Sequence, residues 1–168
     1  FVGVLTAAKS HEKRKAVRKT WGADPRLASV KFFVSVDTVT PGVSEAVQLE
    51  ALRYDDMVLI HHETEDYYRI TVKTLEMMIV AAAAADVGGY THLVKVDDDT
   101  LLRVTRLRKL VGAAPRVNTV IGYVEKPVAP HRTGEFALSH EEWPLGTKFP
   151  TWFHRPCYVV TMDLVRWT

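Results

Sequence analysis

Short apolar runs alternate along this chain with longer segments in which apolar side chains recur at helical spacing. Such alternation is typical of β-α-β units, in which strands lie parallel in one sheet and helices cover its faces. The run from His92 to Val96 is apolar on both faces, as expected of a central strand. The pattern therefore predicts an α/β fold with a mainly parallel central sheet flanked by helices.

The same periodicity, together with turn residues, sets the expected boundaries of the elements. Strands are expected at Val2–Leu5, Val30–Ser35, Met57–Ile60, His92–Val96, Val120–Val124 and Tyr158–Thr161. Helices are expected at about His11–Trp21 with Ser10 as N-cap, at about Ser44–Arg53, at Tyr67–Val87 and, as a short helix, up to Leu107–Val111. The segment from Glu125 to Pro150 is rich in Pro, Gly, His and Trp without a clean period, so we expect a loop that forms a binding surface.

The length of 168 residues and the apolar content of 47% fit a single domain over residues 1–168. With a formal net charge of +2 the chain lacks a strong positive field, and we expect no nucleic acid partner. Its one cysteine, Cys157, excludes a disulfide within the chain. Because the sequence opens with Phe1 inside an expected strand and stops soon after another strand, we expect a C-terminally truncated part of a longer protein.

Three consecutive acids, Asp97, Asp98 and Asp99, directly follow the apolar run. Adjacent carboxylates repel one another, and a bound cation would remove that repulsion. Mg²⁺ and Mn²⁺ prefer carboxylate oxygen, and Mg²⁺ is commonly held by one or two carboxylates together with substrate phosphates. In extended backbone Asp97 and Asp99 would point to one side and Asp98 to the other, so the acids could divide two roles.

Two other interpretations of the acidic triplet involve no metal. It could form a solvated turn, or cap a following helix with Asp99 or Thr100 accepting backbone N–H groups. Ligands of open α/β sheets bind beyond the carboxyl ends of the strands, and the triplet lies at such an end. That position favours a metal site, and a divalent ion there suits chemistry in which a diphosphate is bound or expelled.

Basic residues and missing motifs narrow the kind of ligand. Arg14 and Arg18, four residues apart on one helical face, could meet phosphates, or they could cover apolar surface with their long stems. The sequence has no G-x-x-x-x-G-K-[ST] loop and no G-x-G-x-x-G motif, so the P-loop and dinucleotide-binding classes lose their main support. A G-x-S-x-G nucleophile elbow is also absent.

Four separated blocks of residues carry a more specific signal. They are Glu12–Trp21, Glu65–Thr74, Lys95–Asp99, and Glu141–Pro144 with Phe149–Trp152. In order and rough spacing these blocks resemble the motifs of the β-1,3-galactosyltransferase family (glycosyltransferase family 31), which includes β-1,3-N-acetylglucosaminyltransferases and fringe-like enzymes. The first block is similar to that family's Arg-Arg-x-x-Ile-Arg-x-Thr-Trp motif and the third to its Lys-x-Asp-Asp-Asp metal motif. The likeness covers nearly the whole chain.

The resemblance implies a GT-A type fold, which is a Rossmann-like nucleotide-sugar-binding domain. It also implies inverting β-1,3 transfer of a hexose from a UDP-sugar, with UDP-galactose as the expected donor. Asp99 would then be the direct ligand of Mn²⁺ (or Mg²⁺), Asp97 would support the metal site, and Asp98 would lie near the ribose. The residues implied to place the nucleotide and its diphosphate are Arg14, Arg18 and Lys73.

For the acceptor, the resemblance implies a glycan or glycoprotein, with Trp143 and Trp152 on the acceptor side. An inverting enzyme also needs a general base to deprotonate the acceptor hydroxyl. The family's base would lie beyond Thr168, so no catalytic residue is expected in the chain. Family members are usually Golgi type II membrane proteins, which implies a lumenal Golgi location and an anchor in a segment before Phe1.

The chain departs from the family pattern at Arg155-Pro156-Cys157, where a glycine-rich stretch is expected. Proline fixes φ and has no N–H, whereas glycine leaves the backbone permissive. One alternative is therefore a non-catalytic sugar-nucleotide or carbohydrate-binding module that has lost turnover. A metal-dependent phosphoester hydrolase is a weaker alternative, because such sites gather more His and Asp from several strand ends.

Overall fold

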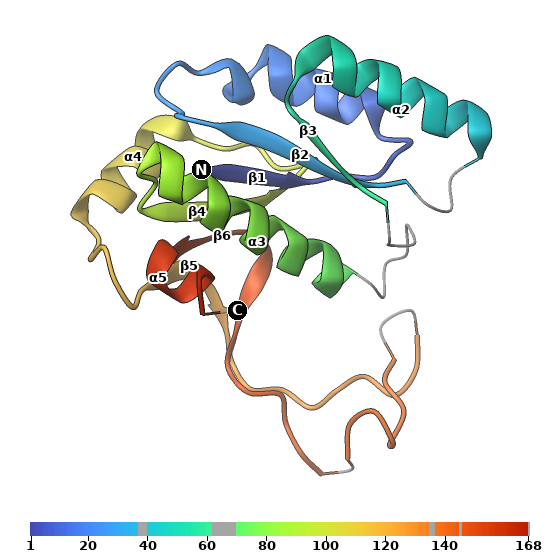
Figure 1. Ribbon diagram of the computed structural model, residues 1–168. Helices are drawn as coiled ribbons and strands as arrows, with labels where there is room; N and C mark the ends of the chain where they lie inside the picture. The colour runs from blue at the N-terminus through green and yellow to red at the C-terminus, as the bar shows by residue number, and fades with distance from the viewer. Residues whose placement is uncertain (37–39, 62–69, 135–136, 145, 168) are drawn as a thin grey trace.

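The computed structural model describes residues 1–36, 40–61, 70–134, 137–144 and 146–167. Within these ranges six strands form one sheet in the order β3-β2-β1-β4-β6-β5 (Figure 1). The strands are β1 (Val2–Leu5), β2 (Val30–Ser35), β3 (Met57–Ile60), β4 (His92–Asp97), β5 (Val120–Glu125) and β6 (Trp152–Thr161). The helices are α1 (His11–Lys19), the 3-10 turn η1 (Trp21–Ala23), α2 (Pro41–Tyr54), α3 (Ile70–Gly88), α4 (Val104–Ala113) and α5 (Met162–Val165).

The sheet is parallel over four strands and antiparallel over the last two. Strand β1 pairs in parallel with both β2 and β4, and β2 pairs in parallel with β3. Strand β6 runs antiparallel to β4 and to β5. The described residues between β5 and β6 contain no helix, and a parallel pair would need such a crossover. The expected α/β fold with a mainly parallel sheet is confirmed.

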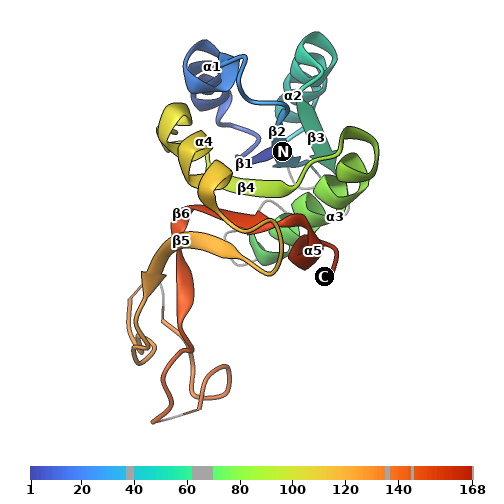
Figure 2. The same ribbon diagram turned by 90° about the vertical axis from the view of Figure 1, so that its left-hand side faces the viewer.

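Helices cover both faces of the sheet, as Figures 1 and 2 show. On one face Val4 and Val96 pack with Val17 of α1 and Val104 of α4 in one buried cluster. On the other face Leu5, Phe33 and Leu93 pack with α3 and α5. The alanine-rich part of α3 lets this helix approach the strands closely, because small side chains keep the two backbones near each other. The core thus consists of two layers, one on each side of the strands.

Helix α2 begins at Pro41, three residues before the expected Ser44, because proline suits the first helical position. The expected start of the longest helix, Tyr67, lies outside the described residues, and α3 is described from Ile70. The short helix α5 was not predicted. None of the helices within the described ranges is long and apolar enough to cross a membrane.

Strand β6 starts at Trp152, six residues before the expected Tyr158. Pro156 lies inside this strand, although proline cannot donate to a ladder. The structure accommodates it where the register between β5 and β6 shifts, between the pairs Gly122↔Tyr158 and Val124↔Phe153. Such a bulge leaves residues unpaired, so a proline is tolerated inside the strand.

The segment between β5 and β6 extends away from the helices and the parallel strands (Figures 1 and 2). Its described residues form turns and irregular backbone, as expected for the stretch from Glu125 to Pro150. Arg132 holds one part together, donating to the carbonyls of Leu138, Ser139 and Trp143 at 3.0, 2.7 and 2.9 Å. We call residues 126–151 the β5–β6 arm.

The close approach of α3 to β1 generates a prediction about Gly3. A Cβ atom added at Gly3 would lie 2.4 Å from Sδ and 2.7 Å from Cγ of the buried Met77. Gly3→Ala should therefore destabilise the fold by about 1–3 kcal/mol, the usual cost of overpacking, measured by urea unfolding. Gly112→Ala in α4 is the matched control, because no atom lies within 4 Å of its added Cβ. It should raise stability slightly through helix propensity. Equal effects of the two substitutions would contradict this account.

Candidate functional site

The site lies where the direction of the strand order reverses. Strand β1 has β2 on one side and β4 on the other, and the carboxyl ends of β1 and β4 are level because Leu5 is paired with Asp97. The backbone N–H of Asp98 donates to the carbonyl of Leu5 at 3.2 Å. In open α/β sheets this switch point is where ligands bind. The topology thus brings the acidic triplet against the β1–α1 loop, residues 6–10.

A pocket of about 310 Å³ occupies this switch point. Its lining comes from the β1–α1 region, from α3 and from the end of β4. These residues are Leu5, Thr6, Ala7, Ser10, Lys13, Ile70, Lys73, Asp97, Asp98 and Asp99. Two larger hollows, of about 470 and 580 Å³, lie at the amino ends of the strands and beside α4, and neither is lined by a carboxylate. Among these three pockets of the described residues, the switch-point pocket is the one that combines carboxylates with lysine side chains.

The acidic triplet ends β4 and enters a turn. Asp97 is the last residue of the strand, and the N–H of Thr100 donates to the carbonyl of Asp97 at 3.2 Å. The indole N–H of Trp21 donates to the carbonyl of Thr100 at 3.0 Å, which fixes the chain just after the turn. The alternative in which Asp99 or Thr100 caps a helix is wrong, because α4 begins only at Val104 and its N-cap is Arg103.

The three carboxylates differ in their partners. Lys13 bridges two of them, with Nζ at 3.1 Å from Asp98 Oδ1 and 3.2 Å from Asp99 Oδ2. Asp97 is paired instead with Lys95 of its own strand. The expected alternation, with Asp97 and Asp99 on one side and Asp98 on the other, is therefore wrong. It assumed extended backbone, and the turn after Asp97 brings the last two acids to one ammonium group.

Exposure also separates the three acids. The Asp99 side chain is 64% exposed, against 23% for Asp97 and 9% for Asp98. Hydrogen bonds from Lys13 to Asp98 and Asp99 raise the pKa of the ammonium group, so it stays charged. Asp99 is thus the acid most open to an incoming ligand, with Lys13 as its present counter-ion.

The acids fit a metal ion that takes some of its ligands from a substrate. Among the described residues no group of three or more His, Cys, Asp or Glu side chains is arranged to hold a metal. Mg²⁺ is typically held by one or two carboxylates together with waters and substrate phosphates, and not by an all-protein cage. One or two acids of the triplet would suffice for such a site, with Asp99 and Asp97 as the predicted ligands.

Lys73 enters the pocket from α3. Its side chain is buried, and Nζ donates to the carbonyl of Thr6 at 3.1 Å, so it fixes the first residue of the β1–α1 loop. The side chain of Lys73 lines the pocket together with the acids at the end of β4. The structure therefore places Lys73 beside Asp97–Asp99, and its contact with a diphosphate stays a prediction.

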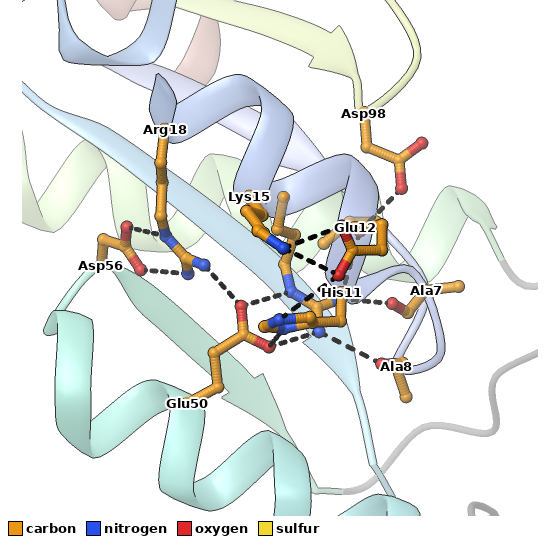
Figure 3. Close-up of polar contacts among 11 residues, drawn as sticks. Ala7, Ala8, His11, Glu12, Lys15, Arg18, Glu50, Asp56 and Asp98 are labelled. Carbon is orange, nitrogen blue, oxygen red and sulfur yellow. Dashed lines mark hydrogen bonds and ion pairs between the residues drawn. The ribbon is translucent and has the colours of Figure 1, made fainter. Parts of the chain in front are cut away.

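Arg18 lies in an ion network with Glu50 and Asp56 (Figure 3), and Arg14 belongs to the same network through Glu50. Arg14 is fully buried, with Nη2 at 2.6 Å from Glu50 Oε2. Arg18 donates from Nη1 to Glu50 Oε1 at 2.5 Å and from Nε to Asp56 Oδ2 at 2.7 Å. Its guanidinium group also stacks on Tyr54, 4.0 Å from the ring centroid. Both arginines thus face acids of the protein, and their contact with a diphosphate stays a prediction.

Glu50 of α2 is the centre of that network. Burial would raise the pKa of its carboxyl group, but hydrogen bonds from Arg14, Arg18 and His11 outweigh burial and lower the pKa to about 2. The carboxylate is therefore ionised at neutral pH, and it neutralises cationic charge that would otherwise be buried unpaired.

The two predicted acceptor-side tryptophans lie close together, away from the pocket. Phe149 lies between them, with ring centroids 4.8 Å from Trp143 and 5.6 Å from Trp152. Both tryptophans are half-buried, so part of each ring remains open to solvent. This aromatic cluster is at the base of the β5–β6 arm, and its role toward an acceptor stays a prediction.

Sequence reasoning missed three residues that shape the site: Thr6, Lys13 and Glu50. Thr6 could have been found, since it directly follows β1 and so lies at a carboxyl end. Lys13 lies one position before Arg14 in the first family-like block, but nothing local says that it reaches the acids. Glu50 carries no local signal at all, because its partners lie 32 to 39 residues away in sequence.

Comparison with known proteins finds a family model and several relatives that match nearly the whole chain. The sequence model described as galactosyltransferase matches residues 12–167. Hydroxyproline O-galactosyltransferase GALT2 of Arabidopsis thaliana is 29% identical over 99% of this chain and 24% of its own length. Beta-1,3-galactosyltransferase GALT1 of the same plant is 32% identical over 97% of this chain and 26% of its own length. The chain thus spans about a quarter of the length of these relatives.

The bridge from Lys13 to two acids generates a prediction about metal affinity. A cation that binds Asp99 has to displace the ammonium group, so Lys13→Gln should tighten the binding of Mn²⁺ alone by about threefold to tenfold. Isothermal titration of the whole protein, without nucleotide, measures this. Lys15→Gln is the matched control, because Lys15 pairs with Glu12 at 3.1 Å and touches none of the three acids. Equal or weaker Mn²⁺ binding by Lys13→Gln would count against competition at this point.

Proposed function

Because the chain belongs to the galactosyltransferase family, we propose that it is the donor-binding part of an inverting, UDP-sugar-dependent β-1,3-hexosyltransferase. The observation that carries the proposal is the pocket at the β1–β4 switch point, where Asp97–Asp99, Lys13 and Lys73 meet. The names of the relatives support galactose as the transferred sugar, and one of them supports the β-1,3 linkage. UDP-galactose is accordingly the proposed donor.

Mn²⁺ or Mg²⁺ is the proposed cofactor, held by Asp99 with support from Asp97. When bound, the ion would neutralise charge that builds on the departing diphosphate. The other tasks fall to this chain's own groups. Lys73 keeps the loop at Thr6 in place and adds positive charge, while Lys13, once released by Asp99, can meet a phosphate oxygen. Asp98, held by Thr6 at 2.7 Å, is proposed to lie near the ribose.

Inverting transfer also requires a general base for the acceptor hydroxyl. Every carboxylate that lines the described pocket belongs to the triplet, and these acids are assigned to the ion and the donor. On the order of the family's motifs, we propose that the base comes from a part of the protein outside this chain. The chain would then bind the donor without completing the reaction.

The acceptor is proposed to meet the β5–β6 arm. Trp143 and Trp152 offer partly exposed aromatic faces of the kind that line many ligand sites. A glycan or a glycoprotein is the proposed acceptor, and the name of one relative adds hydroxyproline as a further candidate. We further propose, on family membership, that the protein works in the Golgi lumen with a membrane anchor outside the chain.

A non-catalytic sugar-nucleotide or carbohydrate-binding module is the second candidate. The observation that favours it is Pro156, which lies in the β5–β6 register shift and lacks the N–H that a close ligand contact could use. The two candidates differ in turnover: the enzyme transfers galactose from UDP-galactose to an acceptor, whereas the module binds UDP and releases no product.

Asp99→Asn tests the donor site. UDP should bind to the whole protein in the presence of Mn²⁺, and EDTA or the Asp99→Asn substitution should weaken binding at least about tenfold, because a metal ligand is lost. Asp86→Asn is the matched control, since this exposed acid pairs with Arg166 far from the pocket and should leave affinity unchanged. UDP affinity that is equal with and without Mn²⁺, or equal in Asp99→Asn, would overturn the proposed donor site.

A further inference from the structure

We propose that Glu50 is a positioning residue for the donor site, which it reaches through Arg14 and Thr6. The inference rests on the proposed function, because it assigns a further residue to the same pocket. Glu50 does not line that pocket and would not touch the substrate. It acts by holding the β1–α1 loop and, through that loop, the carboxylate of Asp98.

The buried end of this connection is a two-point ion pair. Arg14 donates from Nε to Glu50 Oε1 at 3.0 Å and from Nη2 to Glu50 Oε2 at 2.6 Å. The Arg14 side chain is 0% exposed and that of Glu50 is 5% exposed. A two-point pair of this kind fixes the plane of the guanidinium group, and neither charge can be removed without stranding the other in the interior.

The other donors of Arg14 point at the loop. Nη1 donates to the carbonyl of Ala7 at 2.6 Å and to the hydroxyl of Thr6 at 3.4 Å, and Nη2 donates to the carbonyl of Ala8 at 3.2 Å. With the two bonds to Glu50, all five N–H donors of the guanidinium group have acceptors. The plane set by Glu50 therefore sets the positions of three consecutive loop residues.

Thr6 passes this constraint to the acidic triplet. Its hydroxyl has one proton and accepts from Arg14, so that proton is directed to Asp98 Oδ2, 2.7 Å away. The second oxygen of Asp98 is taken by Lys13. Three successive contacts thus connect Glu50 on α2 with an acid on the turn after β4 (Figure 3). A rotation of the guanidinium plane would move both the loop and Asp98.

The ion pair between Arg18 and Asp56 belongs to the same network and serves as a comparison for the pair between Arg14 and Glu50. Arg18 binds Asp56 at 2.7 Å through both Nε and Nη2, so this pair also joins α1 to the rest of the fold. Within the described part of the chain, Asp56 bonds to Arg18 and to Phe32 but not to the β1–α1 loop, and it does not line the pocket. Loss of Asp56 should cost stability without disturbing the loop, whereas loss of Glu50 should do both.

The experiment compares Glu50→Gln with Asp56→Asn. Gln keeps the size of Glu50 but cannot accept on both atoms, so the guanidinium plane is released. At a temperature where both variants are folded, Glu50→Gln should weaken Mn²⁺-dependent UDP binding by about tenfold, the usual scale for an outer positioning residue. Asp56→Asn should leave the UDP dissociation constant unchanged while lowering the melting temperature. Unchanged UDP affinity in Glu50→Gln would overturn the inference.

A double-mutant cycle with Thr6→Val separates positioning from plain loss of stability. Valine has nearly the shape of threonine but cannot pass the constraint to Asp98. Thr6→Val alone should weaken UDP binding, and adding it to Glu50→Gln should produce little further loss, because both changes break one connection. Losses that multiply, or full affinity in Thr6→Val, would contradict the relay. Thr6→Val also decides the question if Glu50→Gln fails to fold.

The outcome for the unaltered protein distinguishes the two proposals. If it binds no UDP in the presence of Mn²⁺, the proposed function fails, and the relay through Glu50 fails with it. If the unaltered protein binds UDP and both Glu50→Gln and Thr6→Val bind equally well, only the relay is wrong.

Discussion

The negative charge at the end of β4 is the constraint on which the rest of the site depends. A buried strand delivers Asp97, Asp98 and Asp99 to one turn, and the level ends of β1 and β4 press that turn against the β1–α1 loop. The protein balances the three acids differently: Lys95 pairs with the first, while Lys13 bridges the other two. Asp99 is the most exposed of the three acids, and its partner Lys13 is more exposed than Lys95. An exposed ion pair is weak, so a metal ion can replace the ammonium group of Lys13 at Asp99.

A second charge balance, between Arg14, Arg18, Glu50 and Asp56, lies behind the first and differs from it in kind. Its central pair is buried, since the side chains of Arg14 and Glu50 are 0% and 5% exposed. Buried ion pairs are weak evidence for stability, because desolvation offsets much of the attraction. The main effect of this ion pair is geometric. It fixes the positions of the loop carbonyls and of Thr6, and through Thr6 the position of Asp98. The ion pairs of the acidic triplet can therefore exchange with a ligand, whereas the pair between Arg14 and Glu50 is fixed.

The periodicity of the sequence predicted the parallel half of the fold well, because each strand from β1 to β4 is a short apolar run followed by a helix or a turn. The periodicity did not predict features that depend on contacts between residues far apart in the sequence. The antiparallel direction of β6 and its early start at Trp152 depend on pairing across a bulge around Pro156. The sequence pointed to the acidic triplet as a site because a fold alone rarely requires three adjacent carboxylates. Glu50 was missed because its contacts with Arg14 and His11 form only after α1 and α2 pack together.

The position of a bound ion tests the central claim most directly. The protein would be crystallised with Mn²⁺ and UDP, and anomalous diffraction measured at the manganese absorption edge. The account predicts a single strong peak at the carboxylate of Asp99, in contact with the diphosphate, and Lys13 moved off that acid. A peak away from Asp97–Asp99, or UDP bound with its diphosphate far from the ion, would contradict it.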